Sequence, residues 1–155
     1  MNMLDKAEAM KLRTKQFAIR IVGVVRSLPR TREGDVIGKQ LLRCGTAVAA
    51  NYRAVCRARS HAEFISKISI VVEEADETVF WLELLADTGV VPADKLTLLV
   101  KEANELLAIC AASLTTAKHN IRSMRVALAF NESMIQSLND SIPCITTTPI
   151  PRWKN

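Results

Sequence analysis

The side chains best suited to binding chemistry in this chain are cations gathered around a basic corner near position 58. They are Arg43, Arg53, Arg57, Arg59 and Lys67. Guanidinium groups bind phosphates through charge and paired hydrogen bonds, so this set predicts a surface that contacts RNA, DNA or a protein that handles nucleic acid. Aromatic residues make up only 5% of the chain, which disfavours base stacking as the main mode. The alternative is an interaction module whose charges serve only subunit assembly.

A run of carboxylates suggests a metal site, but its context does not fit one. The acids are Glu73, Glu74, Asp76, Glu77 and Glu83. Di-metal helical bundles use Glu-x-x-His pairs, and neither His61 nor His119 has a glutamate three residues before it. The segment 34–39 is one residue too short for a phosphate-binding loop, and it is followed by Gln40 instead of Ser or Thr. We therefore expect no enzyme, no metal and no cofactor, and interpret the run as a solvated or interface-facing acidic helix.

Five polar residues are better explained by structural roles. Asn51 lies in an apolar seam, where a polar residue fixes helix register, and Tyr52 beside it can bury its ring. Ser60 and Glu63 have the spacing of a capping box that opens a helix. Asp76 shares a helix flank with apolar residues, so it is either exposed or half-buried beside a cation of the preceding helix. That cation would belong to the same subunit or to a neighbouring one.

Heptad spacing predicts a helix that carries the run of acids from Glu73 to Glu83. Its apolar seam alternates steps of four and three residues: Phe64, Ile68, Val71, Ala75, Thr78, Leu82 and Leu85. This spacing keeps one narrow stripe facing a partner helix, so we expect a helix over 60–88, with Gly89 as its C-terminal cap. The preceding helix, about 33–57, has a seam of the same kind: Ile37, Leu41, Cys44, Val48, Asn51 and Val55.

Two further helices complete the predicted fold. One runs over about 4–28 and ends at Pro29, after which Thr31 can cap the next helix. The last has Pro92 in its first turn and a face of Leu96, Leu99, Ala103, Leu106 and Cys110. Short connections make neighbours antiparallel, so we predict an all-α, up-down-up-down four-helix bundle over residues 1–118. Residues 119–155 are predicted to hold a helical extension and an irregular tail. The extension has a weaker seam of Ile121, Met124, Leu128, Asn131, Ile135 and Leu138.

Charge is segregated along the chain. Residues 1–60 carry 13 Lys and Arg against 4 Asp and Glu, whereas residues 61–118 carry 4 against 10. A basic first hairpin and an acidic second one offer complementary faces for a head-to-tail contact between subunits. The first residues have no apolar core of signal-peptide length, and no run of about 18 apolar residues occurs, so we expect a cytoplasmic protein. The four cysteines form no Cys-x-x-Cys pair and are expected to pack as small hydrophobes.

Several linked motifs resemble one known family. In order they read GKQLLR at 38–43, ANYR at 50–53, RARS at 57–60, AEFI at 62–65, EADET at 74–78 and WLELL at 81–85. Over roughly 11–118 the chain is similar to the bacterial four-helix-bundle family, also called 23S ribosomal RNA intervening-sequence proteins. The resemblance implies an antiparallel bundle that assembles into a homo-oligomeric ring, with five subunits. It also implies a distant kinship with the accessory proteins of diversity-generating retroelements, which associate with reverse transcriptase and nucleic acid.

Overall fold

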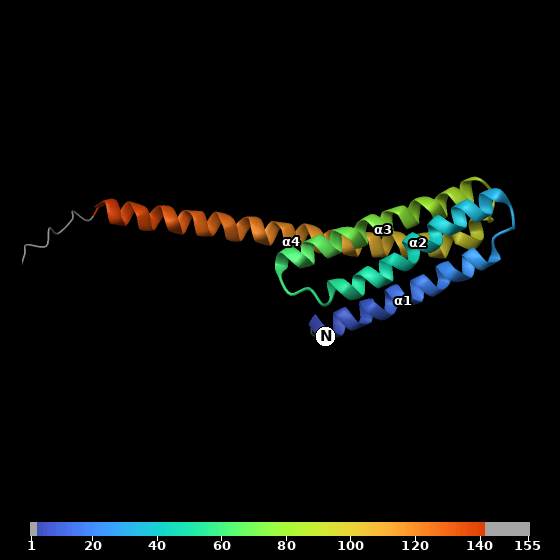
Figure 1. The fold of residues 1–155 in the computed structure, drawn as a ribbon, viewed down its shortest axis with the longest axis horizontal. Coiled ribbons are helices and arrows are strands. Elements are labelled where there is room, and N and C mark those ends of the chain that lie inside the picture. Colours follow the sequence, from blue (N-terminus) through green and yellow to red (C-terminus); the bar gives the residue numbers. More distant parts are fainter. Residues whose placement is uncertain (1–2, 142–155) are drawn as a thin grey trace, which may run out of the picture. The chain divides into compact units, whose positions relative to one another are not determined.

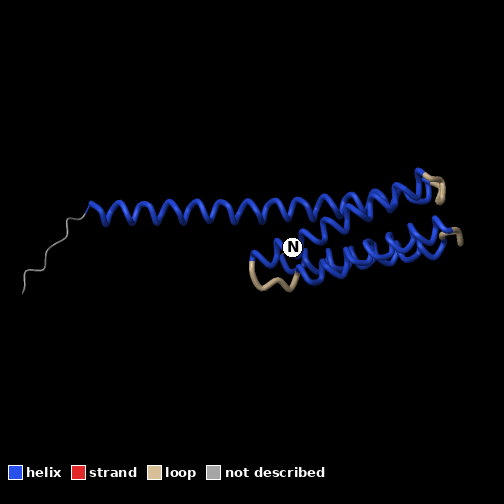
Figure 2. Tube along the Cα trace, turned by 45° about the horizontal axis from the view of Figure 1, so that its top comes forward, coloured by secondary structure: helices blue, strands red, loops and turns tan. Residues whose placement is uncertain are grey.

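The structure, a computed structural model, describes the backbone of residues 3–141 and the side-chain surroundings of residues 5–134. It contains four helices: α1 Met3–Ser27, α2 Arg32–Val55, α3 His61–Asp87 and α4 Ala93–Ser141 (Figure 1). Figure 2 shows loops only at the three short connections within this described range, which holds no strand. The predicted all-α class and the four helices are confirmed.

Local signals in the sequence explain where the helices begin and end. Thr31 is extended and its Oγ1 accepts from the Gly34 amide at 3.1 Å, which caps α2 as predicted. Gly89 follows α3 with φ +68°, a conformation that glycine adopts without steric cost. Helix α2 ends two residues earlier than predicted. The Arg57 amide donates instead to the Ala54 carbonyl at 3.1 Å, which tightens the chain into a turn.

The predicted seams form the core. All predicted seam positions of α3 are buried except Phe64, which is half-buried, and in α2 only Asn51 is half-buried rather than buried. The predicted face of α4 from Leu96 to Cys110 is buried as well. Sequence periodicity overlooked Thr14, which is fully buried in α1 and donates its hydroxyl to the Lys11 carbonyl at 3.1 Å. That internal bond makes a buried threonine tolerable in the seam.

Two apolar clusters show how the helices run. One cluster joins the end of α1, the start of α2, the end of α3 and the start of α4, as Ile21, Ile37, Leu85 and Leu96 illustrate. The other joins the end of α2 to the start of α3 and to Cys110 of α4. Consecutive helices therefore pack end against start, and Figure 1 shows the chain reversing direction at each connection within residues 3–119.

A close approach of α1 to α2 depends on Gly45. A Cβ at this position would lie 2.8 Å from Cγ2 of Ile21, closer than side chains pack. Gly45 therefore lets α1 and α2 pack closely at this point. The exposed Gly23 of α1 carries no such constraint, because nothing lies within 4 Å of the place that a Cβ would take there.

The chain divides into two compact units, Met1–His119 and Asn120–Asn155. Helix α4 continues without interruption to Ser141, so the predicted extension begins as part of this helix. That the extension is a separate domain stays a prediction. The predicted irregular tail and Cys144 lie outside the described residues.

Candidate nucleic-acid interface

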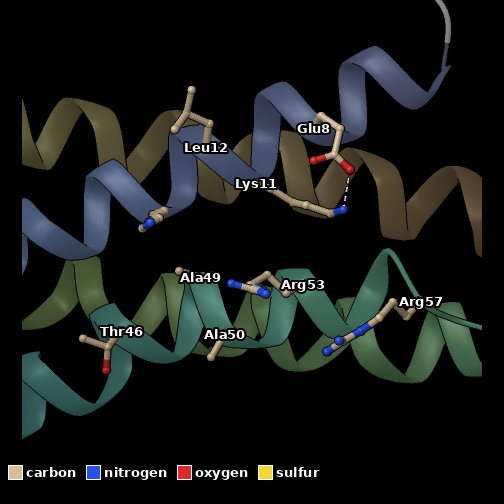
Figure 3. Close-up of a pocket in the computed structure, with 9 residues that line it drawn as sticks. Glu8, Lys11, Leu12, Thr46, Ala49, Ala50, Arg53 and Arg57 are labelled. Carbon is tan, nitrogen blue, oxygen red and sulfur yellow. Dashed lines mark hydrogen bonds and ion pairs between the residues drawn. The ribbon is translucent and has the colours of Figure 1, made fainter.

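A groove of about 840 Å³ runs between α1 and α2 on the outside of the bundle. Its lining residues are Glu8, Lys11, Leu12, Lys15, Thr46, Ala49, Ala50, Arg53 and Arg57. Figure 3 shows Lys11 and Glu8 on one wall, with Arg53 and Arg57 on the other. Four cations and one acid therefore line the same groove.

Helical spacing places these residues together. On α1 the lining positions fall mostly three or four residues apart, and on α2 they repeat in a similar way from Thr46 to Arg53, with Arg57 in the turn that follows the helix. Residues so spaced share one face of a helix. This face of α2 lies beside the buried seam, and its small residues Ala49 and Ala50 leave room for the groove between two basic walls.

Most cations of the groove lack an acidic partner. Lys11 Nζ lies 2.5 Å from Glu8 Oε1, which neutralises one charge of each sign. Lys15, Arg53 and Arg57 form no ion pair with any described residue. All three residues are exposed. The groove therefore keeps an uncompensated charge of about three cations, which attracts polyanions.

Two arginines elsewhere on the first unit, Arg13 and Arg43, are neutralised by neighbouring helices. Arg13 of α1 donates from Nε to Glu102 Oε1 at 2.8 Å and from Nη2 to Glu105 Oε2 at 2.5 Å, both on α4. The hydrogen bond with Arg13 holds the pKa of Glu102 below its ordinary value, and the pKa of Arg13 is raised in turn. These charges fasten α1 to α4 and are not free for a ligand.

Arg43, one of the predicted binding residues, is neutralised in the same way. Its Nη1 donates to Glu74 of α3 at 3.1 Å, and its Nη2 donates to Glu77. Trp81 Nε1 donates to Glu77 at 3.1 Å as well. The hydrogen bonds from Arg43 and then Trp81 lower the pKa of Glu77. Although Arg43 is exposed, its charge is shared with two carboxylates.

Arg59 and Lys67 also lie outside the groove. Both approach Glu63, Lys67 Nζ at 2.7 Å and Arg59 Nε at 3.7 Å. Glu63 accepts from the Arg59 amide at 2.7 Å, and Ser60 Oγ accepts from the Glu63 amide at 3.1 Å. Ser60 and Glu63 thus cap α3 as predicted, although the Glu63 side chain reaches one residue further back than Ser60. Hydrogen bonds from Lys67 and Arg59 lower the pKa of Glu63.

The remaining predicted structural residues differ in their surroundings. Asn51 and Tyr52 are half-buried in α2, and Tyr52 packs against the cluster that contains Val55 and Ile68. Burial raises the pKa of the Tyr52 hydroxyl. Asp76 is exposed rather than half-buried. Arg43, a cation of the preceding helix that could have paired with it, binds Glu74 and Glu77. The half-buried ion pair that was one alternative for Asp76 within the subunit is therefore not formed. Pairing of Asp76 across a subunit boundary stays a prediction.

The folded bundle brings Arg53 and Arg57 together with other cations than the sequence pattern predicted. The pattern placed Arg53 and Arg57 with Arg59 and Lys67, whereas the groove joins them to Lys11 and Lys15 of α1. The spacing of Lys11 and Lys15, four residues apart, was the available signal for a shared basic face. What spacing alone does not reveal is which face of α1 lies next to α2. A binding role for Arg59 and Lys67 stays a prediction.

The described residues were compared with the requirements for a metal-ligand cluster and for a membrane-spanning helix. Within them, no three His, Cys, Asp or Glu side chains lie close enough together to hold a metal ion. No described helix combines the length and hydrophobicity that crossing a membrane requires. Cys44 and Cys110 are buried and Cys56 is half-buried, all as free thiols. Burial raises the pKa of Cys110 to about 11.

Comparison with known proteins identifies the family. The model of the family described as 23S rRNA-intervening sequence protein matches residues 8–112. A similar solved structure is the crystal structure of a protein with unknown function from the S23 ribosomal protein family of Bacteroides thetaiotaomicron. It shares 33% identity and a TM-score of 0.65, over 71% of this chain and 98% of that one. A comparison with the curated proteins gives no match. Because the family model spans more than half of the sequence, the chain belongs to the 23S rRNA-intervening sequence protein family.

Proposed function

We propose that this protein is a non-enzymatic, homo-oligomeric bundle that binds the phosphate backbone of nucleic acid in the α1–α2 groove. The observation that carries the proposal is the contrast between two groups of cations. Arg13 and Arg43 are neutralised by carboxylates, whereas Lys15, Arg53 and Arg57 line one groove without acidic partners among the described residues. A chain that folds with unpaired cations in a groove bears a repulsion that a polyanion relieves.

The chemistry of the groove favours backbone contact over base reading. Its polar groups are ammonium and guanidinium groups, a carboxylate and the Thr46 hydroxyl, and its described lining includes no aromatic side chain. Phosphate contacts position a nucleic acid without specifying its sequence. The family takes its name from an intervening sequence of 23S rRNA, which makes RNA the first ligand to test.

The test is RNA binding by the intact protein as salt is varied. Fluorescence anisotropy with a labelled single-stranded RNA should show the logarithm of affinity falling linearly with the logarithm of salt concentration. The double variant Arg53→Ala with Arg57→Ala should make that slope shallower by roughly 0.7 for each arginine–phosphate ion pair that is removed. Arg30→Ala with Arg32→Ala is the matched control, because both arginines are exposed, form no ion pair with any described residue and lie outside the groove. Equal weakening in the double variant and the control would reject the groove as the site.

A second function of the groove is favoured by one exposed apolar residue in its lining and another further along α1. Leu12 is 57% exposed, and Ile19, seven residues further along the same helix, is 60% exposed. Exposed apolar residues on one face mark surfaces that contact another protein. With a basic rim, such a surface also suits a contact with an acidic surface of another subunit. If the double variant dissociates into monomers in light scattering while staying folded, the groove is a subunit contact rather than a nucleic-acid site.

A further inference from the structure

The second unit exposes an apolar helix that has no cover among the described residues. From Asn120 to Met134, every side chain except that of Ile121 is exposed. Met124 is 67% exposed and Leu128 is 57% exposed. Helical segments of this length are marginal in water by themselves and gain most of their stability by packing an apolar face. An exposed apolar face of this kind is typical of a surface that packs against a partner.

The heptad register of α4 indicates which face packs. Counting back in steps of seven from Met124 leads to Ala117, Cys110, Ala103 and Leu96, and all four are buried. The same register continues forward through Leu128 to Asn131, where the side chains are exposed. The same face of α4 is thus buried from Leu96 to Ala117 and exposed from Met124 to Asn131. The segment 121–131 has no charged residue in this seam.

We propose that residues 120–141 of α4 form a parallel coiled coil with the same segment of a second copy. Alternating steps of three and four residues from Ile121 to Asn131 are the spacing of such a seam. The sequence continues the pattern with Ile135 and Leu138. This segment lies outside residues 8–112, so the pairing is an addition to the shared bundle.

Asn131 identifies the partner as the same helix in parallel orientation. A carboxamide both donates and accepts hydrogen bonds, so an asparagine in a seam is satisfied by the same asparagine at the same level. Parallel, in-register pairing brings Asn131 of each copy together, and polar seam residues set register in this way. Antiparallel pairing would set Asn131 against an apolar seam residue such as Leu128 of the second copy and leave the amide unpaired in an apolar layer.

Cysteine cross-linking of the full chain tests the pairing directly. The four native cysteines are replaced by alanine, and single cysteines are introduced by Met124→Cys in the seam and Val126→Cys on the far face. Mild oxidation should link Met124→Cys chains into covalent dimers and leave Val126→Cys chains largely monomeric, because disulfides need Cα atoms within about 7 Å. Equal cross-linking at both positions, or none at position 124, would overturn the proposal.

Hydrogen exchange with the native cysteines in place gives a second measurement, which is unaffected if the cysteine-free chain folds poorly. Amides of residues 120–134 should be protected in the unmodified protein and lose that protection in Leu128→Glu. Phe130→Glu, a change on the far face at a residue 70% exposed, is the control and should keep it. Disappearance of the protection in both variants would overturn the proposed seam, because a different surface would then be covered. The absence of protection in the unmodified protein would show that the segment has no partner.

Discussion

Whether an arginine of this bundle is available to a ligand depends on the helix that faces it. Arg43 and Arg53 belong to the same helix, yet Arg43 meets glutamates of α3 whereas Arg53 faces lysines across the groove. Both are exposed arginines. The sequence pattern therefore identified both as candidates, but only the packing of the helices separates a neutralised arginine from a free one.

The pair between Arg13 and Glu102 makes a prediction about pH. Because the folded pKa of Glu102 is depressed, its contribution to stability is fully present above about pH 4.5 and is lost as the pH falls through the folded pKa. Glu102→Gln should therefore lower the free energy of unfolding at neutral pH by about 1 kcal/mol, a modest value because Arg13 is 34% exposed.

Urea denaturation at neutral pH and at about pH 3 measures this effect. Below about pH 4.5 the unfolded chain binds a proton at this carboxyl more readily than the folded protein does, so the difference from Glu102→Gln should shrink as the pH is lowered. A difference that is equally large at both pH values would show that the glutamine perturbs packing instead of removing a charge.

At the scale of helices, the sequence predicted what each helix buries but not how the helices meet. The seams of α2 and α3 and the caps at Thr31 and Ser60 follow from spacing and residue type, because both are local properties. The groove depends on the juxtaposition of residues far apart in the chain, such as Lys11 and Arg53. The rotation of α1 about its axis decides which residues meet, and periodicity constrains it only loosely.

Gly45 offers a test of the packing of α1 on α2. Gly45→Ala places a methyl group 2.8 Å from Ile21, a buried β-branched side chain that cannot rotate away freely. We expect a loss of about 1–2 kcal/mol in the free energy of unfolding, measured by urea denaturation. Gly23→Ala is the matched control. Its methyl group meets nothing within 4 Å, so better helix propensity should raise stability by up to about 1 kcal/mol.

The opposite signs of these two changes are the decisive feature. Both replace glycine by alanine inside a helix, so propensity favours both equally. If Gly45→Ala also raises stability, Ile21 adjusts without cost and the approach of α1 to α2 does not depend on this glycine.

At the scale of the whole molecule, the basic first half and the acidic second half are only partly neutralised within one subunit. Arg13 and Arg43 join the halves, but groove cations remain on one side, and Glu73, Asp76 and Glu83 remain exposed on α3. Two different surfaces that complement one another form a heterologous contact between subunits. Such a contact closes into a ring when the rotation from one subunit to the next allows it. The five subunits implied by the family resemblance fit such a ring and stay a prediction.

Asp76 tests whether the acidic face of α3 takes part in this assembly. Because the residue is exposed within its own subunit, Asp76→Asn should change the stability of the isolated fold by less than about 0.5 kcal/mol. If Asp76 meets a cation of a neighbouring subunit, the same change should lower the oligomer mass in multi-angle light scattering at micromolar concentration. Asp94→Asn, an exposed acid at the start of α4, is the control and should leave the mass unchanged.

Two outcomes of that measurement would contradict the assembly through charge. A monomer at micromolar concentration in the unmodified protein would exclude the ring, and an Asp76→Asn protein of full mass would remove this face from the contact. Salt separates the ring from the coiled coil proposed for residues 120–141, because the coiled coil uses an apolar seam rather than these charges. Added salt should therefore weaken the ring contact while cross-linking at position 124 persists.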